Sequence, residues 1–455
     1  MTNLLGKPNL WDRTDPAEVA ELALALGRID SPSGEEQAVS DFLYDWCADA
    51  GLSPRRVRSH PDRAANIVAR IPGTGGGSSL LFNSHMDTAV APGDRTYFAE
   101  PDRPEFHTAW RDGDELVGAG VVNDKGPMAC WLVAAATLRR EGVRLPGDLV
   151  LTMVTGEIGH EPVDDLDGPR HQGKDHGSRY VATHGGLADF VVVAETTSFA
   201  PIWVEPGKAF FRIEVRGRDR GVYTPYLRRP YEVAEQPNAI ARAAPVITAI
   251  EAWAYDYQER NRSIREAGEV VPKVNIGAVR AGHPTQPILS PASCVLYVDV
   301  RIPPGDHPLG VQDELRGLVR AVTPDADVEC YLFRRGYEAT GAEPLVDALR
   351  AATDAEVAPE RRTDPGHTPS SMWRDLNVWN EMGMPAVTYG PGQGTGAGNV
   401  SITATDLAAC ARVYVRTALE ICGTPRGLAS STPRSAATRV ERAGSPGRQR
   451  AKRAR

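Results

Sequence analysis

The sequence contains a group of histidine and carboxylate residues whose spacing suits a metal site. The segment Leu80–Ala89 is an apolar run that ends in His85-x-Asp87. Asp124 lies in the loop Val122–Pro127, directly before a predicted helix. Imidazole and carboxylate groups are ligands for zinc and related divalent ions, so these residues are candidates for metal chemistry.

Two glutamates extend this group. Glu157 follows the apolar run Leu149–Val154, and Glu195 follows Phe190–Ala194. The carboxyl ends of parallel strands meet at one edge of an open α/β sheet, where such folds place their ligand sites. A single histidine after a strand is more often structural. One histidine and several carboxylates in this order favour a divalent ion with a general base beside it.

The elements that must position these residues indicate two kinds of folding unit. Continuous apolar runs alternate with helical segments up to about residue 205, which is typical of a parallel sheet buried on both faces. Before them, helices are predicted at 16–26 and 35–50, and Ser33–Glu36 resembles a capping box. Further on, strands such as Cys294–Val300 interleave with helical segments near 237–259 and 308–322, which indicates an inserted α+β unit.

The predicted fold class is therefore α/β, with a catalytic domain interrupted by a smaller domain. The predicted boundaries are 1–205 for the first part of the catalytic domain, 206–333 for the insertion, 334–423 for the second part and 424–455 for a disordered tail. The tail carries eight Arg and one Lys against one Glu. It is predicted to be dispensable, and weak, salt-dependent contact with nucleic acid is the alternative.

The composition excludes several classes of protein. Hydrophobic residues make up 41% and charged residues 24% of the 455, as in soluble globular proteins. The net charge of −8 becomes −16 without the tail, so a nucleic-acid partner is not expected. No run reaches the ~20 apolar residues of a membrane span, and no secretory signal is recognised. The six cysteines form no Cys-x-x-Cys pair, which predicts free thiols and a cytoplasmic location.

Over residues 15–423 the chain resembles the zinc-dependent family of aminoacylases, acetylornithine deacetylases, succinyl-diaminopimelate desuccinylases and glutamate carboxypeptidases. The Ser-His-x-Asp-Thr motif at 84–88 carries the resemblance. Supporting matches are Asn-Asp-Lys-Gly at 123–126, Asn-Ile-Gly at 275–277, Asp-Val-Arg at 299–301 and Tyr-Gly-Pro-Gly at 389–392. The resemblance implies a metal-binding α/β catalytic domain with an inserted α+β lid domain that commonly forms a homodimer.

The resemblance also implies roles for individual residues. His85, Asp124 and Glu195 match metal ligands, and Asp87 matches the carboxylate that orients the histidine ring. Glu157 matches the general base that activates water.

Other matches concern substrate binding. Arg301 resembles the lid arginine that grips a substrate carboxylate. Tyr223 stands where the family often has a histidine that steadies the oxyanion, and packing under the lid is the alternative. Arg374, Asp375 and His367 are candidates for the pocket wall, with capping and surface pairing as the alternative.

The departures from the family concern one of its two metal positions. Ile158 replaces a second glutamate, and no histidine follows His367. We therefore predict a single Zn²⁺ rather than two, with another divalent ion left open. His160 and Glu161 are candidate replacement ligands in a histidine-rich segment that could equally be an ordinary polar loop.

The predicted function is a metallohydrolase that cleaves the amide bond of an N-acyl amino acid or a small peptide-like substrate carrying a carboxylate. Metal-activated water would attack, with Glu157 as the base. An acyl-transfer or amide-forming enzyme on the same site, and a catalytically silent binding or scaffold homologue, are the alternatives.

Overall fold

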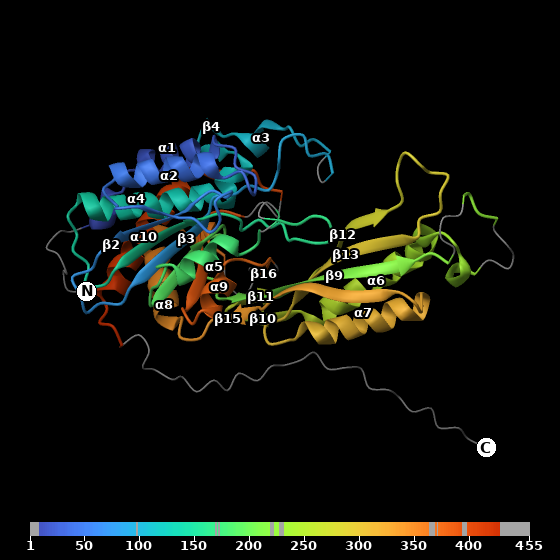
Figure 1. The fold of residues 1–455 in the computed structure, drawn as a ribbon. Coiled ribbons are helices and arrows are strands. Elements are labelled where there is room, and N and C mark those ends of the chain that lie inside the picture. Colours follow the sequence, from blue (N-terminus) through green and yellow to red (C-terminus); the bar gives the residue numbers. More distant parts are fainter. Residues whose placement is uncertain are drawn as a thin grey trace, which may run out of the picture.

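The computed structural model describes residues 9–96, 99–168, 171, 173–218, 223–226, 232–363, 369–370, 372–393 and 398–427. Two larger sheets each have a hydrophobic core of their own and form two bodies that lie end to end (Figure 1). Among the described residues, no helix is long and apolar enough to cross a membrane. The candidate residue His367 and the tail from 428 onwards lie outside the described residues.

The larger body contains a six-stranded sheet in the order β1-β2-β6-β3-β7-β17. Its strands are β1 (Arg55–Val57), β2 (Asn66–Ile71), β3 (Leu80–His85), β6 (Leu149–Val154), β7 (Phe190–Ala194) and β17 (Ala386–Tyr389). The four strands β6, β3, β7 and β17 run parallel; at one edge β2 pairs antiparallel with β6, and β1 pairs antiparallel with β2. The carboxyl ends of the parallel strands therefore open onto one common edge.

Helices cover both faces of this sheet. One face packs on α1 (Pro16–Gly27), α2 (Gln37–Asp49), α4 (Gly126–Arg140), α8 (Glu343–Glu356) and α10 (Ala404–Gly423), and the other on α5 (His176–Thr183) and α9 (Leu376–Glu381). Successive residues of β3 alternate between the two cores: Phe82 enters the first and Leu81 the second. This double burial explains the continuous apolar runs of the sequence.

The start of α2 corrects a sequence expectation. Ser33 and Glu36 do not form a capping box, because α2 begins at Gln37 without a side-chain cap. Ser33 Oγ instead donates to Asp87 Oδ2 at 2.6 Å, and Glu36 Oε1 accepts from the Gly156 backbone N–H at 3.1 Å. Both side chains therefore form hydrogen bonds with buried polar groups. Leaving those groups unpaired would cost more free energy than leaving the exposed end of a helix uncapped.

The smaller body, which we call the lid, contains an antiparallel sheet in the order β12-β13-β9-β14. Its strands are β9 (Gly207–Arg216), β12 (Val274–Ala281), β13 (Ser293–Ile302) and β14 (Asp327–Arg334), with α6 (Ala239–Asn261) and α7 (Pro308–Val322) packed on one face. Asn238 caps α6 by accepting from the Ile240 N–H at 2.8 Å. The division of the chain at 206–333 stays a prediction.

Short elements complete the described chain. They are α3 (Pro104–His107), β4 (Trp110–Asp112), β5 (Glu115–Val117), β8 (Val204–Glu205), β10 (Ser263–Arg265), β11 (Gly268–Val270), β15 (Tyr337–Glu338), β16 (Pro369–Ser370) and β18 (Ser401–Thr403), together with single turns of helix at Leu10–Arg13, Val121–Lys125, Val233–Glu235 and Pro359–Arg361.

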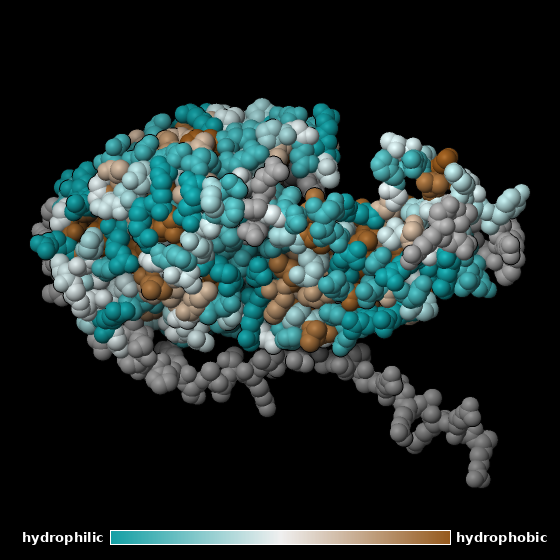
Figure 2. Space-filling view, in the orientation of Figure 1, coloured by the Kyte–Doolittle hydropathy of each residue, from teal (hydrophilic) through white to brown (hydrophobic). Residues whose placement is uncertain are grey.

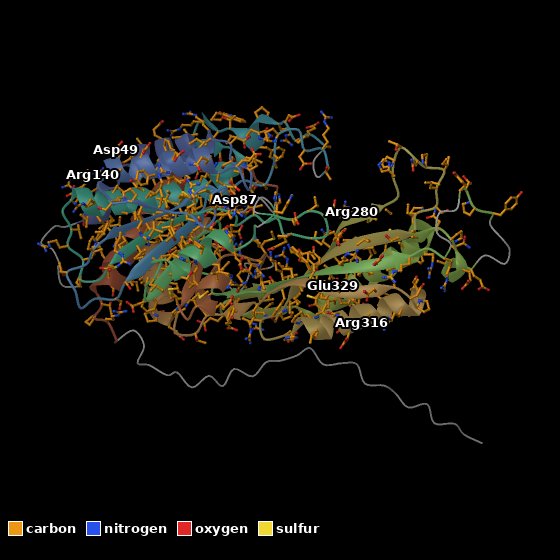
Figure 3. The ribbon with its side chains drawn as sticks, viewed as in Figure 1. Asp49, Asp87, Arg140, Arg280, Arg316 and Glu329 are labelled. Carbon is orange, nitrogen blue, oxygen red and sulfur yellow. The ribbon has the colours of Figure 1, made fainter. Side chains whose placement is uncertain are left out.

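A segment of the larger body reaches across to the lid. We call residues 158–168 the strap, because they leave β6 and extend towards the lid sheet in Figure 1. Asp164 accepts from Arg212 Nε of β9 at 3.0 Å, and Asp165 pairs with Arg280 of β12. In Figure 3, Asp87 is labelled on the larger body and Arg280 on the lid. The strap therefore links the edge of the first sheet to the second by acid–base pairs.

Candidate metal centre

Three side chains converge at the carboxyl edge of the parallel strands. One ligand atom each of His85, Glu157 and Glu195 lies within 4.8 Å of the others, and all three residues are buried. His85 ends β3, while Glu157 and Glu195 follow β6 and β7. The His85 Nε2 to Glu195 Oε1 distance is 3.9 Å. The sheet thus brings together groups that are far apart in sequence, at a spacing that a metal ion could bridge.

Asp87 holds this edge together. Its Oδ1 accepts from the Glu157 N–H at 3.0 Å and its Oδ2 from the Ile158 N–H at 2.8 Å. Oδ1 also lies 3.3 Å from His85 Nδ1. Burial alone would raise the Asp87 pKa, but the contacts with His85 and the hydroxyl of Ser33 outweigh it and lower the pKa. The His85 Nδ1 side is therefore engaged, and Nε2 is left to face the centre, as in metal sites where a carboxylate orients the histidine.

Asp124 is the unsatisfied acid of the centre. It is fully buried, and neither carboxylate oxygen has a hydrogen-bond partner among the described residues; it adjoins the cluster of His85, Glu157 and Glu195 but is not one of its three members. Burial and the charge on Glu195 raise the Asp124 pKa well above its ordinary value. Burial likewise raises the Glu195 pKa. Unpaired carboxylates this deep are costly unless a cation binds them, so the donor set fits a divalent ion.

His85 Nε2 is not without a partner in this structure. It lies 2.9 Å from Asn123 Oδ1. Asn123 precedes Asp124 in the turn Val121–Lys125, which carries both residues to the end of β3. A metal on Nε2 would take the place of this contact.

Two cations border the acids. Lys174 Nζ donates to Glu157 Oε1 at 2.6 Å, and Arg374 Nε lies 3.5 Å from Glu195 Oε2. Arg374 is also paired with the fully buried Glu205. The neighbouring Asp375 is buried behind the centre, where Ser178 donates to it, and burial together with Glu157 raises its pKa to about 7. Arg374 thus lies at the centre, while Asp375 supports it from behind.

The two candidate replacement ligands lie outside the cluster of His85, Glu157 and Glu195. His160 is exposed, and its ring lies 6.2 Å from that of His171. Glu161 points to the lid, with its Oε1 3.7 Å from Lys208 Nζ.

The other histidines of this stretch have local partners. His176 Nε2 lies 2.8 Å from Ser59 Oγ, and His184 Nδ1 lies 2.7 Å from the carbonyl of Tyr180. Neither belongs to the His85 cluster, in keeping with an ordinary polar loop.

The two lid candidates differ in their surroundings. Arg301, on β13, is held by Asp299 through Nε and Nη2 at 3.1 and 2.8 Å, and its buried Nη1 has no partner among the described residues. Tyr223 is 68% exposed and forms an isolated bridge with Leu289. Within one chain the structure places Tyr223 on the lid surface rather than at the centre.

Sequence reasoning missed several residues that the structure brings to this region. Lys174 and Lys208 carry no motif that marks them, and Asn123 entered the sequence analysis only as part of the Asn-Asp-Lys-Gly match at 123–126. Lys208 is 1% exposed, and burial together with the charge on Lys174 lowers its pKa to about 7. The one available signal was position: Asn123 adjoins a predicted ligand, and Lys174 follows the histidine-rich segment.

Comparison with known proteins places this arrangement in a family. The model for peptidase family M20/M25/M40 matches residues 81–420. Succinyl-diaminopimelate desuccinylase of Gluconacetobacter diazotrophicus is 26% identical over 67% of this chain and 72% of its own length. N-formyl-4-amino-5-aminomethyl-2-methylpyrimidine deformylase of Bacillus subtilis is 29% identical over 36% of this chain and 35% of its own. The chain thus aligns with only about a third of that relative.

Solved structures agree on the fold. A metallo-carboxypeptidase of family M20 from Sulfolobus solfataricus has a TM-score of 0.62 at 13% identity, covering 89% of this chain and 99% of its own. A Bacillus subtilis M20 peptidase described as binding a dinuclear metal has a TM-score of 0.55 at 14% identity, covering 90% and 99%. These likenesses confirm the predicted α/β fold with an inserted domain.

Proposed function

The chain belongs to peptidase family M20/M25/M40, and from this premise we propose that it is a metal-dependent hydrolase of the amide bond in an N-acyl amino acid or a small peptide-like substrate. The observation that carries the proposal is the buried convergence of His85, Glu157 and Glu195 beside the unpaired carboxylate of Asp124. Relatives named as a desuccinylase and a deformylase support an amide substrate.

Each side chain of the centre has its own role in the proposed reaction. His85, Asp124 and Glu195 would hold a divalent ion, with zinc expected. When bound, such an ion supplies Lewis-acid polarisation of the amide carbonyl and lowers the pKa of water. Asp87 keeps the His85 ring oriented through its contact with Nδ1. Glu157 accepts the proton of the attacking water and passes it to the departing amine nitrogen.

We propose that one ion rather than two completes the centre. The Ile158 side chain has no ligand atom, its backbone N–H donates to Asp87, and its carbonyl oxygen accepts from the Ser33 hydroxyl. His160 is exposed, and Glu161 is directed to Lys208 of the lid rather than to the centre. Elemental analysis of protein reconstituted with zinc would give one tightly held ion per chain, whereas two would overturn this part of the proposal.

Glutamine at position 157 tests the mechanism. Glu157→Gln keeps the volume but removes the base, so kcat should fall by about 100- to 10,000-fold while one zinc stays bound. Glu259→Gln on α6 is a matched control with the same chemical change far from the centre. Near-normal turnover by Glu157→Gln would refute the assignment. A screen of N-acyl amino acids and dipeptides identifies the substrate, and no hydrolysis by zinc-loaded protein would refute the function.

The proposed setting is a homodimer in the cytoplasm, formed through the lid. The edge strand β12 exposes Val279, and the nearby Ile288 is also exposed, which supports a lid interface. All six cysteines are free, which supports a reducing compartment. In such a dimer, any role of Tyr223 would concern the metal centre of the partner subunit rather than the centre of its own chain. Light scattering on the purified chain tests the dimer, and a monomer at micromolar concentration would contradict it.

A further inference from the structure

Lys174 is brought to the metal centre by a close crossing of two backbone segments. The chain leaves the end of β6, passes through the strap and returns to the start of the strap at Gly173. There the Gly173 N–H donates to the His160 carbonyl at 2.7 Å. A side chain at Gly159 would overlap the Lys174 backbone, and one at Gly173 would overlap His160, so the crossing requires glycine at both positions. Lys174 therefore follows the crossing directly and lies beside the proposed base.

The ammonium of Lys174 is fixed on one oxygen of Glu157. Its Nζ donates to Glu157 Oε1 at 2.6 Å, and the two side chains are 13% and 6% exposed. The ring centre of the buried Trp373 is 5.7 Å from the same Nζ. An ammonium group has three N–H donors, and among the described residues Glu157 is the one hydrogen-bond acceptor that Nζ contacts. The ammonium therefore keeps donors for a bound molecule.

This contact leaves Glu157 with Oε2 for the reaction. As the base, Glu157 takes a proton from the attacking water, and Lys174 already occupies Oε1, so the water is directed to Oε2. Because the two oxygens of a carboxylate are neighbours, the water and the ammonium lie side by side. The carbonyl group that this water attacks then comes within reach of the Lys174 ammonium.

From this arrangement we propose that Lys174 is a catalytic residue, which donates a hydrogen bond to the carbonyl oxygen of the scissile amide as that oxygen becomes negative. The inference rests on the proposed amide hydrolysis and adds to it the group that stabilises the oxyanion. Tyr223, the candidate that the sequence offered for this task, is 68% exposed on the lid of its own chain. Lys174, by contrast, contacts the base itself.

The movement of charge in the reaction explains why an ammonium suits this place. As water attacks, one of its O–H bonds breaks and the proton passes to Glu157, while the water oxygen bonds to the carbonyl carbon and the carbonyl electron pair moves to the carbonyl oxygen. Glu157 becomes neutral as that oxygen becomes an anion. The negative charge thus passes from one neighbour of Lys174 to another, and a donor already in place stabilises it without reorganisation.

The second half of the reaction restores the starting charges. The oxyanion forms the carbonyl group again, the C–N bond breaks with its electron pair on nitrogen, and Glu157 returns its proton to that nitrogen. Lys174 is then paired with the Glu157 carboxylate as before. The ammonium keeps its proton throughout, so its contribution is electrostatic.

Kinetics of protein loaded with one equivalent of zinc measure this contribution. Lys174→Met removes the donor and should lower kcat about 100- to 1,000-fold, the usual cost of losing one donor to an oxyanion. KM should change little, because the ammonium is paired with Glu157 until the charge moves. Lys174→Gln can still donate to Glu157 but lacks the positive charge, so it should show a similar loss and keeps the test decisive if Lys174→Met does not fold. Melting temperatures establish which variants are folded.

Two probes test the same role without turnover. One is a phosphinic analogue of Ala-Gly, which is tetrahedral and anionic in place of the peptide bond, and the other is the hydroxyethylene analogue, which is tetrahedral and uncharged there. Isothermal titration of the one-zinc protein should show a preference for the phosphinic probe that falls about 10- to 100-fold in Lys174→Met, as expected for one charge-assisted hydrogen bond. Arg316→Met on α7 removes a lid cation elsewhere and should leave the preference unchanged.

The outcomes separate the two proposals. A preference that is the same in wild type and the Lys174 variants, a wild type that binds neither probe, or a kcat within about 3-fold of wild type in folded Lys174→Met overturns the role of Lys174. Because titration needs no turnover, a chain whose preference depends on Lys174 but that hydrolyses no amide would refute the proposed function and leave the oxyanion site standing.

Discussion

Replacing Glu36 with glutamine tests how the structure behind the metal centre tolerates buried charge. Glu36 is fully buried; one oxygen accepts from the Gly156 N–H at 3.1 Å, and the other has no hydrogen-bond partner among the described residues. Burial, followed by the charge on Asp87, raises its pKa from 4.5 to about 7. The carboxyl group is therefore held in an environment that disfavours its charged form.

The direction of the effect on stability follows from proton binding. The unfolded chain loses the Glu36 proton near pH 4.5, whereas the folded chain keeps it to about pH 7. Between these values the native state binds more protons, so the free energy of unfolding falls as the pH rises. The shift of roughly 2.5 pH units corresponds to at most about 3 kcal/mol at pH 8.

Glutamine removes this penalty because it is uncharged and still offers an oxygen to Gly156. We expect Glu36→Gln to be more stable than the wild type by up to about 3 kcal/mol at pH 8, and by less than about 1 kcal/mol at pH 5. Urea denaturation at pH 5, 6, 7 and 8 measures this, with the exposed Glu35→Gln as control. A difference that does not change with pH, or a variant less stable than wild type at pH 8, would refute the reasoning.

Three further predictions concern other contacts. Asp87→Asn should lower the free energy of unfolding by about 1–3 kcal/mol, because one of the two buried backbone N–H groups that donate to Asp87 loses its acceptor. It should also lower the affinity for zinc about 10- to 100-fold, because the contact that orients His85 is lost. An unchanged zinc titration would contradict this. Deleting 428–455 should leave the melting temperature unchanged, whereas deletion from Thr424 should lower it, because the Thr424 carbonyl accepts from a backbone N–H at 2.8 Å; equal melting temperatures would contradict the distinction. Arg242→Leu should cost the lid about 1–3 kcal/mol in urea denaturation, because the fully buried guanidinium pairs with Asp325, and a neutral effect would contradict that.

The strands of the first sheet were predictable because both of their faces are buried. The runs 149–154 and 190–194 coincide with β6 and β7, and the family resemblance is confirmed by the match over 81–420. Burial on both faces requires an apolar side chain at nearly every position, so such a strand is recognised in the sequence as a continuous apolar run. Because these parallel strands end at one edge of the sheet, the polar residues that follow each strand lie together at that edge.

The predicted capping box does not form, because its residues bond to partners that are distant in the sequence. Ser33 and Glu36 have the right types and spacing for a helix start, but their partners, Asp87 and Gly156, are distant in sequence. Local spacing cannot reveal a competitor that only the fold brings near. The direct pairing of Lys208 with Arg301 and Arg334 across the lid sheet was hidden likewise, because strand register is a property of the sheet and not of any one strand.

Charge balance also bears on how many ions the centre holds. Lys174 and Arg374 face two of the five buried acids around it, which are Asp87, Asp124, Glu157, Glu195 and Asp375. A single divalent ion between Asp124 and Glu195 would bring the group close to neutrality. A second ion next to Glu157 would be repelled by the Lys174 ammonium, because a divalent ion and a unit positive charge about 4 Å apart repel by about 8 kcal/mol at an effective dielectric constant of 20.

Lys174→Met should therefore ease binding of a second zinc, detectable as a rise in bound zinc from one towards two per chain during titration. Methionine keeps the approximate length of the side chain while removing the charge, so the fold around residue 174 should persist. Arg316→Met, which removes a lid cation far from the centre, is the matched control and should keep one ion. If Lys174→Met still binds a single ion with unchanged affinity, then the lysine does not exclude a second ion, and the missing ligand at Ile158 alone must do so.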